Sequence, residues 1–156
     1  MKIRLLGIGK TNEAFIQDGI THFEQRLVKY NPFETEFLPG LKKTGKLSQR
    51  EQNDQEGQLL LKQIQEKETI ILLDHTGHSM SSPQFAKYVD QLLQHGGKRL
   101  TFIIGGAYGF SAALQERADG VLSLSPMTFS HQIVRLLFME QLYRAMTILR
   151  NEPYHH

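Results

Sequence analysis

The first residues that could carry out chemistry lie near the C-terminus. His131 and Arg135 are four residues apart at the start of an expected helix, so their side chains share one face. Histidine titrates near neutral pH, and a cation beside a helix N-terminus suits an anion, so the pair could bind an anionic substrate or transfer a proton. The spacing fits an ordinary surface pair equally well. Tyr154, near the end of the chain, has a ring able to stack on a nucleobase, although a frayed end would look the same.

Two other segments have the residue types of binding sites. Gly105-Gly106-Ala107-Tyr108-Gly109 follows an apolar run and lets the backbone approach a ligand closely. Its spacing does not match the dinucleotide fingerprint, and a simple tight turn is the alternative. His75 and His78 are three residues apart with no third ligand nearby, so we expect no metal site.

The composition limits the possible classes of protein. The chain has 156 residues, 40% hydrophobic, and no cysteine, which predicts one domain spanning residues 1–156 and excludes thiol catalysis and thiolate metal sites. No apolar run approaches the roughly 20 residues of a membrane span, so we expect a soluble cytoplasmic protein without a membrane partner. The net charge of +2 neither favours nor excludes RNA as a partner.

Strand and helix patterns alternate along the chain. This order predicts an α/β fold with a mostly parallel sheet and helices on both faces. The sequence predicts strands at 3–8, 35–38, 69–74, 100–104 and 121–124, with loops at 39–46, 75–81 and 125–129. It predicts helices at 14–30, 49–67, 82–95 and 130–150, and a short one capped by Ser111. Ser82 is the expected cap of the helix that contains Pro83.

The last helix is apolar on more than one side. A helix of this kind in a small domain packs on its own sheet and on a partner subunit, or lies deep in its own core. The sequence favours the partner subunit and leaves the second interpretation open.

Several segments together resemble one family. They include Gly7-Ile8-Gly9-Lys10, Ile104 to Ser111, Ser123 to His131, Glu140 to Ala145 and Glu152-Pro153-Tyr154-His155. The chain resembles the RlmH family, bacterial 23S ribosomal RNA pseudouridine N3-methyltransferases of the SPOUT class, nearly from end to end. The resemblance implies a SPOUT-type α/β fold with a C-terminal trefoil knot, a homodimer, and S-adenosylmethionine as methyl donor.

The resemblance also assigns residues. The donor contacts that it implies fall on Leu73, Gly105, Leu124, Ser125, Pro126, Met127, Thr128 and Phe129. Pro126 stands where the family often has lysine, and it lacks a backbone N–H, so no donor contact can come from that amide.

Methylation of an imide nitrogen requires the loss of its proton. The candidate bases are His131 and His155, with Arg135 and Arg144 binding phosphate or the imidate oxygens and Tyr154 stacking on the target base. The expected substrate is 23S rRNA within an assembled ribosome, with the lysine-rich loop at Lys42, Lys43 and Lys46 as a possible contact. The alternatives are a non-catalytic ribosome-associated binding protein and a SPOUT enzyme that acts on tRNA.

Overall fold

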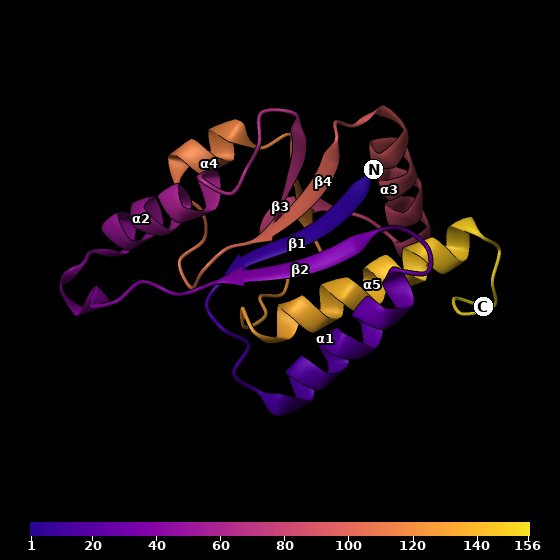
Figure 1. The fold of residues 1–156 in the computed structure, drawn as a ribbon, viewed down its shortest axis with the longest axis horizontal. Coiled ribbons are helices and arrows are strands. Elements are labelled where there is room, and N and C mark those ends of the chain that lie inside the picture. Colours follow the sequence, from indigo (N-terminus) through magenta and orange to yellow (C-terminus); the bar gives the residue numbers. More distant parts are fainter.

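Five parallel strands form the centre of the molecule (Figure 1), in a computed structural model that describes residues 1–156. Their order across the sheet is β2-β1-β4-β3-β5, and each neighbouring pair is parallel. The strands are β1 (Lys2–Ile8), β2 (Phe33–Leu38), β3 (Glu68–Ser79), β4 (Arg99–Ile104) and β5 (Gly120–Ser123). Because all run in one direction, their carboxyl ends meet at one edge, where ligands bind in open α/β sheets.

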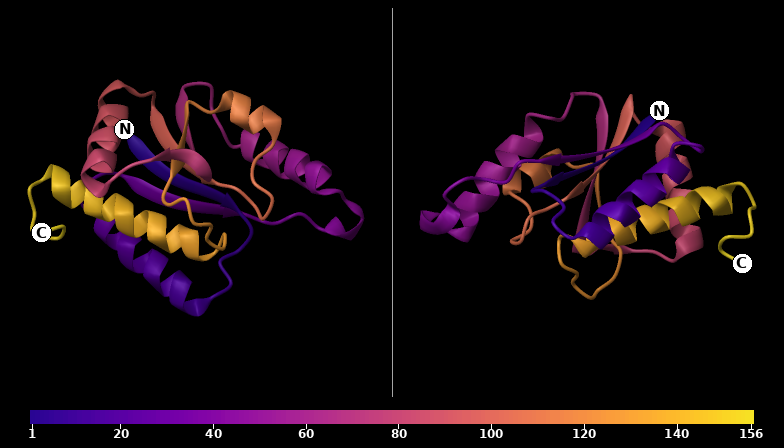
Figure 2. Two further views of the ribbon diagram at one scale, coloured as in Figure 1. Left: turned by 180° about the vertical axis from the view of Figure 1, so that it is seen from behind. Right: turned by 60° about the horizontal axis from the view of Figure 1, so that its bottom comes forward.

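Helices cover both faces of the sheet, as the sequence predicted (Figures 1 and 2). On one face lie α1 (Ala14–Leu27), α3 (Ser82–His95) and α5 (Ile133–Leu149). On the other lie α2 (Gln49–Leu61) and α4 (Ala112–Arg117). A 3-10 turn, η1 (Thr44–Lys46), falls in the segment between β2 and α2. No helix is both long and apolar enough to cross a membrane.

The alternation of side chains along each strand explains the two layers of helices. In β1, Ile3 and Leu5 enter the larger core beneath α1, α3 and α5, whereas Leu6 and Ile8 enter the smaller core beneath α2 and α4. The central strands are therefore apolar on both faces, which produces the continuous hydrophobic runs seen in the sequence.

The structure corrects the predicted loop at residues 75–81. β3 continues from Asp74 through Ser79, and after a register shift His78 and Ser79 pair with β5. Gly77 permits this, because a Cβ there would lie 2.8 Å from backbone carbon atoms of Val121 and Leu122. The prediction failed because this half of the strand is polar and is held by backbone pairing rather than by buried side chains.

The predicted cap of α3 was also wrong by one residue. Ser81, not Ser82, is the N-cap: its hydroxyl accepts from the Gln84 amide at 3.3 Å, and the Gln84 side chain accepts from the Ser81 amide at 2.9 Å. Two other predicted helices were too long: α2 ends at Leu61, six residues before the predicted end, and α5 starts at Ile133, three residues after the predicted start. Ser48 and Ser111 cap α2 and α4 as predicted.

The last helix lies between α1 and α3 and contacts both (Figure 2). Its buried side chains include Phe138, Met139 and Leu142. Neighbours within the chain thus cover much of the apolar surface that the sequence ascribed to a partner. The homodimer stays a prediction.

Candidate active site

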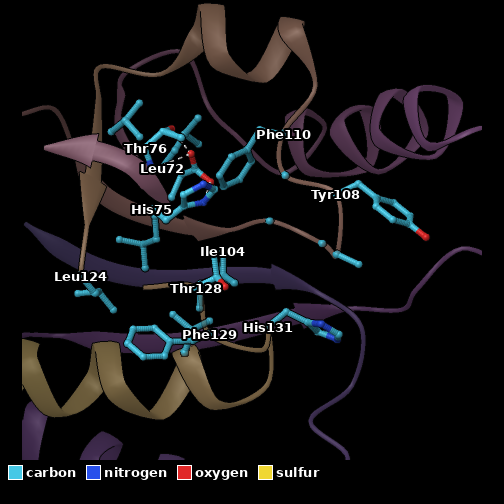
Figure 3. Close-up of a pocket in the computed structure, with 18 of the residues that line it drawn as sticks. Leu72, His75, Thr76, Ile104, Tyr108, Phe110, Leu124, Thr128, Phe129 and His131 are labelled. Carbon is cyan, nitrogen blue, oxygen red and sulfur yellow. Dashed lines mark hydrogen bonds and ion pairs between the residues drawn. The ribbon is translucent and has the colours of Figure 1, made fainter. Parts of the chain in front are cut away.

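The carboxyl ends of β3, β4 and β5 enclose an open pocket of about 970 Å³. The pocket is lined by 22 residues, half of them hydrophobic. On one side lie His75 and Thr76, and on the other Phe129 and His131, with Ile104 between them (Figure 3). The lining comprises Leu72 to Thr76, Ile104 to Phe110, Gln115, Val121, Leu124, Ser125, Met127 to His131 and Val134. A pocket of this size and composition suits a small organic ligand with few polar groups.

Asp74 is the only formally charged side chain in the lining when the histidines are neutral. Its Oδ2 accepts hydrogen bonds from the amide and the hydroxyl of Thr76, and its Oδ1 lies 3.6 Å from His75 Nδ1. These contacts hold the carboxylate at the point where β3 leaves the apolar core. The pocket is therefore half apolar with one negative charge at its edge, an environment that favours a ligand with a positive charge.

The glycine-rich loop after β4 forms the second wall. A Cβ on Gly105 would lie 2.9 Å from the Gly109 carbonyl oxygen, and Gly109 has a φ of +85°. The Gly109 amide donates to the Gly106 carbonyl at 3.3 Å, which closes the turn. The turn itself thus requires these glycines, as the simpler interpretation of the sequence held, and the same residues line the pocket.

The loop between β5 and α5 forms the third wall. Ser123 Oγ donates to the Ser125 carbonyl at 2.8 Å, and Ser125 Oγ accepts from the Met127 amide at 3.0 Å. Met127 and Phe129 remain exposed, at 76% and 41% of their surface. Of the residues that the resemblance assigns to donor binding, Leu73, Gly105, Leu124, Ser125, Met127, Thr128 and Phe129 line this one pocket. Pro126 belongs to the same loop but does not line it.

His131 and Arg135 do not share an environment. His131 is exposed at the mouth of the pocket, whereas Arg135 is only 1% exposed. The Arg135 guanidinium donates to Thr11 Oγ1 at 2.8 Å and to the Ile8 carbonyl at 2.9 Å, and its Nε has no hydrogen-bond partner. Burial lowers the pKa of Arg135 to about 10. In this structure Arg135 therefore joins α5 to the segment after β1 and is not open to an anion.

The two remaining predicted catalytic residues, Tyr154 and His155, lie beside the predicted substrate-binding Arg144, at the far end of α5. Glu140 accepts from Arg144 at 2.6 Å and from the Tyr154 hydroxyl at 2.9 Å, and Arg144 Nη1 lies 3.3 Å from His155 Nδ1. Burial, with the hydrogen bond to Glu140, raises the pKa of Tyr154. Tyr30 also donates to Glu152 at 2.5 Å, so the tail is tied to the turn that follows α1.

Within one chain this terminal cluster is remote from the pocket. Thirteen residues of chain separate His131 from Arg144, or roughly 20 Å along a helix at 1.5 Å per residue. Figure 2 shows the loop before α5 and the C-terminal tail at opposite ends of the helix. The predicted catalytic residues therefore form two groups rather than one site.

The whole chain matches known proteins. The family model described as "Predicted SPOUT methyltransferase" matches residues 1–155. "Ribosomal RNA large subunit methyltransferase H" from Parabacteroides distasonis is 47% identical over 156 residues, which is 100% of this chain and 99% of the relative. The protein of the same name from Christiangramia forsetii is 49% identical with the same coverage. The chain belongs to the RlmH family of SPOUT methyltransferases.

Solved structures agree with this fold. A "probable methylase family protein" from Haemophilus influenzae superposes with a TM-score of 0.53 at 11% identity, covering 97% of this chain and 69% of the other. A "probable methyltransferase" from Bordetella pertussis gives a TM-score of 0.52 at 11% identity, covering 93% and 94%. At this identity the likeness concerns the fold alone. In this RlmH-family chain, the SPOUT α/β fold expected from the sequence is confirmed.

Sequence reasoning missed residues on two sides of this RlmH-family pocket. His75, which the sequence placed in a loop, belongs to β3 and lines the pocket. On the other side, α2 packs behind the glycine-rich loop: Asn53 Nδ2 donates to the Tyr108 carbonyl at 2.8 Å, and Glu56 lies against Gly106. The three-residue spacing of Asn53 and Glu56 put them on one helix face, but nothing in the sequence indicated which loop that face meets.

Proposed function

We propose that this chain transfers a methyl group from S-adenosylmethionine to N3 of a pseudouridine in 23S rRNA, on an assembled ribosome. The names of the full-length relatives support the reaction and the class of RNA. The structural observation that carries the donor assignment is the pocket itself, half apolar and with Asp74 as its one formal charge. S-adenosylmethionine carries a positively charged sulfur and a flat adenine, and such a pocket suits both.

The residues present fit that donor. Leu73 and Phe129 both line the pocket, and their side chains would supply apolar surface for the adenine ring. The Gly105 and Thr128 segments bring backbone groups to its edges, and Asp74 places a negative charge nearby. When bound, the donor supplies a methyl group on a sulfur that leaves readily as a neutral thioether. The protein's task is then to align the acceptor nitrogen with that methyl carbon and to receive the acceptor's proton.

His131 is the proposed base. It stands exposed at the mouth of the same pocket, where an acceptor base could approach the bound donor. The imidazole is placed to take the N3 proton of the acceptor as N3 bonds to the methyl group that a bound donor would supply. Arg135 is assigned a supporting role instead, because its guanidinium is committed to Thr11 and Ile8.

The terminal cluster requires a second copy of the chain if it is to act beside His131. We therefore propose a homodimer in which α5 helices pair about a twofold axis, so that Arg144, Tyr154 and His155 of one copy approach the pocket of the other. Exposed apolar side chains occur near both ends of α5: Met127 and Phe129 lie before the helix, and Leu149 and Tyr154 lie at its C-terminal end. Mixed dimers of an H131A chain and a Y154A chain test this proposal. A shared site leaves one intact composite site per mixed dimer, which restores activity, whereas mixtures as inactive as either variant alone would exclude sharing.

A lysine-rich arm is the proposed contact with ribosomal RNA. Lys42, Lys43 and Lys46 are exposed, form no ion pair, and lie in the segment that projects beyond β2 (Figure 1). β2 ends at the same edge of the sheet as the pocket. The arm can thus bind phosphates while the target base enters the pocket. We also propose that residues 1–156 act as a single SPOUT methyltransferase domain in the cytoplasm, where ribosomes are found.

Donor binding is the first test of this function. A protein that binds S-adenosylmethionine in its folded state gains stability with ligand concentration, so millimolar donor should raise the melting temperature by several degrees. The variant L73R, which places a cation in the pocket, should lose that shift. The absence of a shift for the natural chain would contradict the enzyme function and favour a binding role on the ribosome.

A further inference from the structure

Glu56 is a buried acid that the proposed reaction does not use. Glu56 is 8% exposed, on the face of α2 that packs behind the glycine-rich loop. It forms no ion pair, and its carboxylate accepts one hydrogen bond, from Gln52 Nε2 at 3.1 Å. An ionised carboxylate buried without a counterion is costly, and a cation bound nearby would offset part of that cost.

The carboxylate lies directly behind the pocket. A Cβ built on Gly106 would come within 2.4 Å of Glu56 Oε2, so the acid occupies the space that a side chain at that position would fill. Gly106 itself lines the pocket, whereas Glu56 does not. A single glycine backbone therefore separates the carboxylate from the ligand space.

The contact is fixed from neighbouring positions. Asn53, one helical turn earlier, donates to the Tyr108 carbonyl at 2.8 Å, which holds the glycine-rich loop against α2. Gly57 packs so tightly on α4's N-cap that a Cβ would lie 2.1 Å from Ser111 Oγ. The helix thus has little freedom to draw the carboxylate away from Gly106.

We propose that Glu56 is a specificity-determining residue that favours the charged methyl donor over its neutral product. This rests on the proposed function. The donor carries a sulfonium, whereas S-adenosylhomocysteine, which remains after transfer, carries an uncharged thioether in the same place. A carboxylate separated from the ligand by the Gly106 backbone attracts the sulfonium of the donor but not the thioether of the product. The attraction is strong because nearby unit charges interact strongly where little water intervenes. The buried negative charge thereby helps the donor to displace the product after each turnover.

Asp74 provides a second negative charge at the pocket, but its position differs. Asp74 is tied to Thr76 and faces His75 at the edge of the lining, where it is open to direct contact with a ligand. Glu56 lies behind the wall and can act only through its charge. Removing its charge while keeping its shape is therefore a clean test.

The experiment measures the dissociation constants of S-adenosylmethionine and S-adenosylhomocysteine by calorimetry for the natural chain, E56Q and E56D. E56Q should weaken donor binding by about tenfold and leave product binding within about twofold, as expected for the loss of one nearby charge. E56D, which keeps the charge, should retain most of the natural preference. E51Q removes an exposed acid from the same helix and should change neither constant.

Two results would overturn the proposal. Equal weakening of both ligands by E56Q would show that Glu56 only supports the loop, and unchanged constants would show that its charge does not reach the ligand. N53A provides the comparison for a loop effect, because releasing the Tyr108 carbonyl should weaken both ligands alike. If the natural chain bound neither ligand, the proposed function would fail, which is distinguishable from either result.

Discussion

The guanidinium carbon of Arg135 lies 4.1 Å from the centre of the Phe37 ring, so a cation from α5 stacks on an aromatic side chain from β2. The same group donates to Thr11 and to the Ile8 carbonyl. Arg135 thereby joins the first two strands, the segment after β1 and the last helix. Its fully buried position explains why it cannot also face a substrate.

Replacing Arg135 should therefore affect stability. R135A leaves the Ile8 carbonyl and Thr11 without a donor and opens a cavity, so we expect the free energy of unfolding to fall by about 2–4 kcal/mol. Urea denaturation measures this, with R50A, an exposed arginine on α2, expected to change stability by no more than about 0.5 kcal/mol. If R135A had normal stability but no methyl transfer, Arg135 would instead act in the reaction itself.

Gly77 should be intolerant of a side chain. G77A would place a methyl group 2.8 Å from the β5 backbone and force β3 and β5 apart, at a cost of about 2–3 kcal/mol. G45A, where nothing lies within 4 Å of the added Cβ, is the matched control. Thermal unfolding of both variants provides the comparison. Equal stability would mean that the two strands are not held together at this point.

The raised pKa values of three tyrosines predict how the free energy of unfolding depends on pH in the alkaline range. The hydrogen bond to Glu152 raises the pKa of Tyr30, and burial raises the pKa values of Tyr88 and Tyr154. In the unfolded chain tyrosine ionises near pH 10, so above about pH 9 the folded state binds more protons than the unfolded state. The contribution of these tyrosines to the free energy of unfolding should therefore be complete below about pH 9 and should fall as pH rises through 10. Y30F should show a shallower decline, and an identical decline would exclude Tyr30 as a contributor.

Hydrophobic patterns predicted most of this fold. The apolar runs at Ile70 to Leu73 and Leu100 to Ile104 coincide with central strands, because burial on both faces leaves a strong local signal. The polar half of β3 carries no such signal, and its pairing depends on Gly77 meeting a strand more than 40 residues away. The trefoil knot that the family resemblance implies stays a prediction, since no local pattern encodes threading.

The sequence predicted part of the candidate site and missed the rest, because some of its contacts leave no local signal. Leu73 lies at the end of the apolar half of β3, and Gly105 and Phe129 follow β4 and β5, so their meeting in one pocket follows from parallel topology. The spacing of His131 and Arg135 correctly placed both near the start of α5, but four residues on a helix do not decide which side chain is buried. Glu56 could not be found from the sequence, because its importance comes from a glycine 50 residues further along.

The lysine-rich arm should affect ribosome binding and not donor binding. Replacing Lys42, Lys43 and Lys46 with glutamine should raise the KM for ribosomes severalfold and weaken its dependence on salt, because fewer phosphates are neutralised. The donor dissociation constant should stay unchanged. The control K29Q/K87Q/K98Q removes the same charge from exposed positions elsewhere. Equal effects of the two triple variants would indicate a general charge effect and no specific contact.

Removing the proposed base should slow the chemical step. H131A should reduce the single-turnover rate of methyl transfer by about 100-fold near neutral pH. The deficit should shrink as pH rises, because the imide then loses its proton without assistance. H78A, which removes an exposed histidine of β3 outside the pocket, is the control. An undiminished rate for H131A would remove this residue from the mechanism.

The most direct test is to follow the methyl group itself. The purified chain is incubated with labelled S-adenosylmethionine and ribosomes from a strain lacking its gene, and the label is located by mass spectrometry of the large-subunit RNA. We predict a single labelled nucleotide, a pseudouridine methylated at N3. Label on tRNA alone, or no transfer despite tight binding of the donor, would contradict the proposed function.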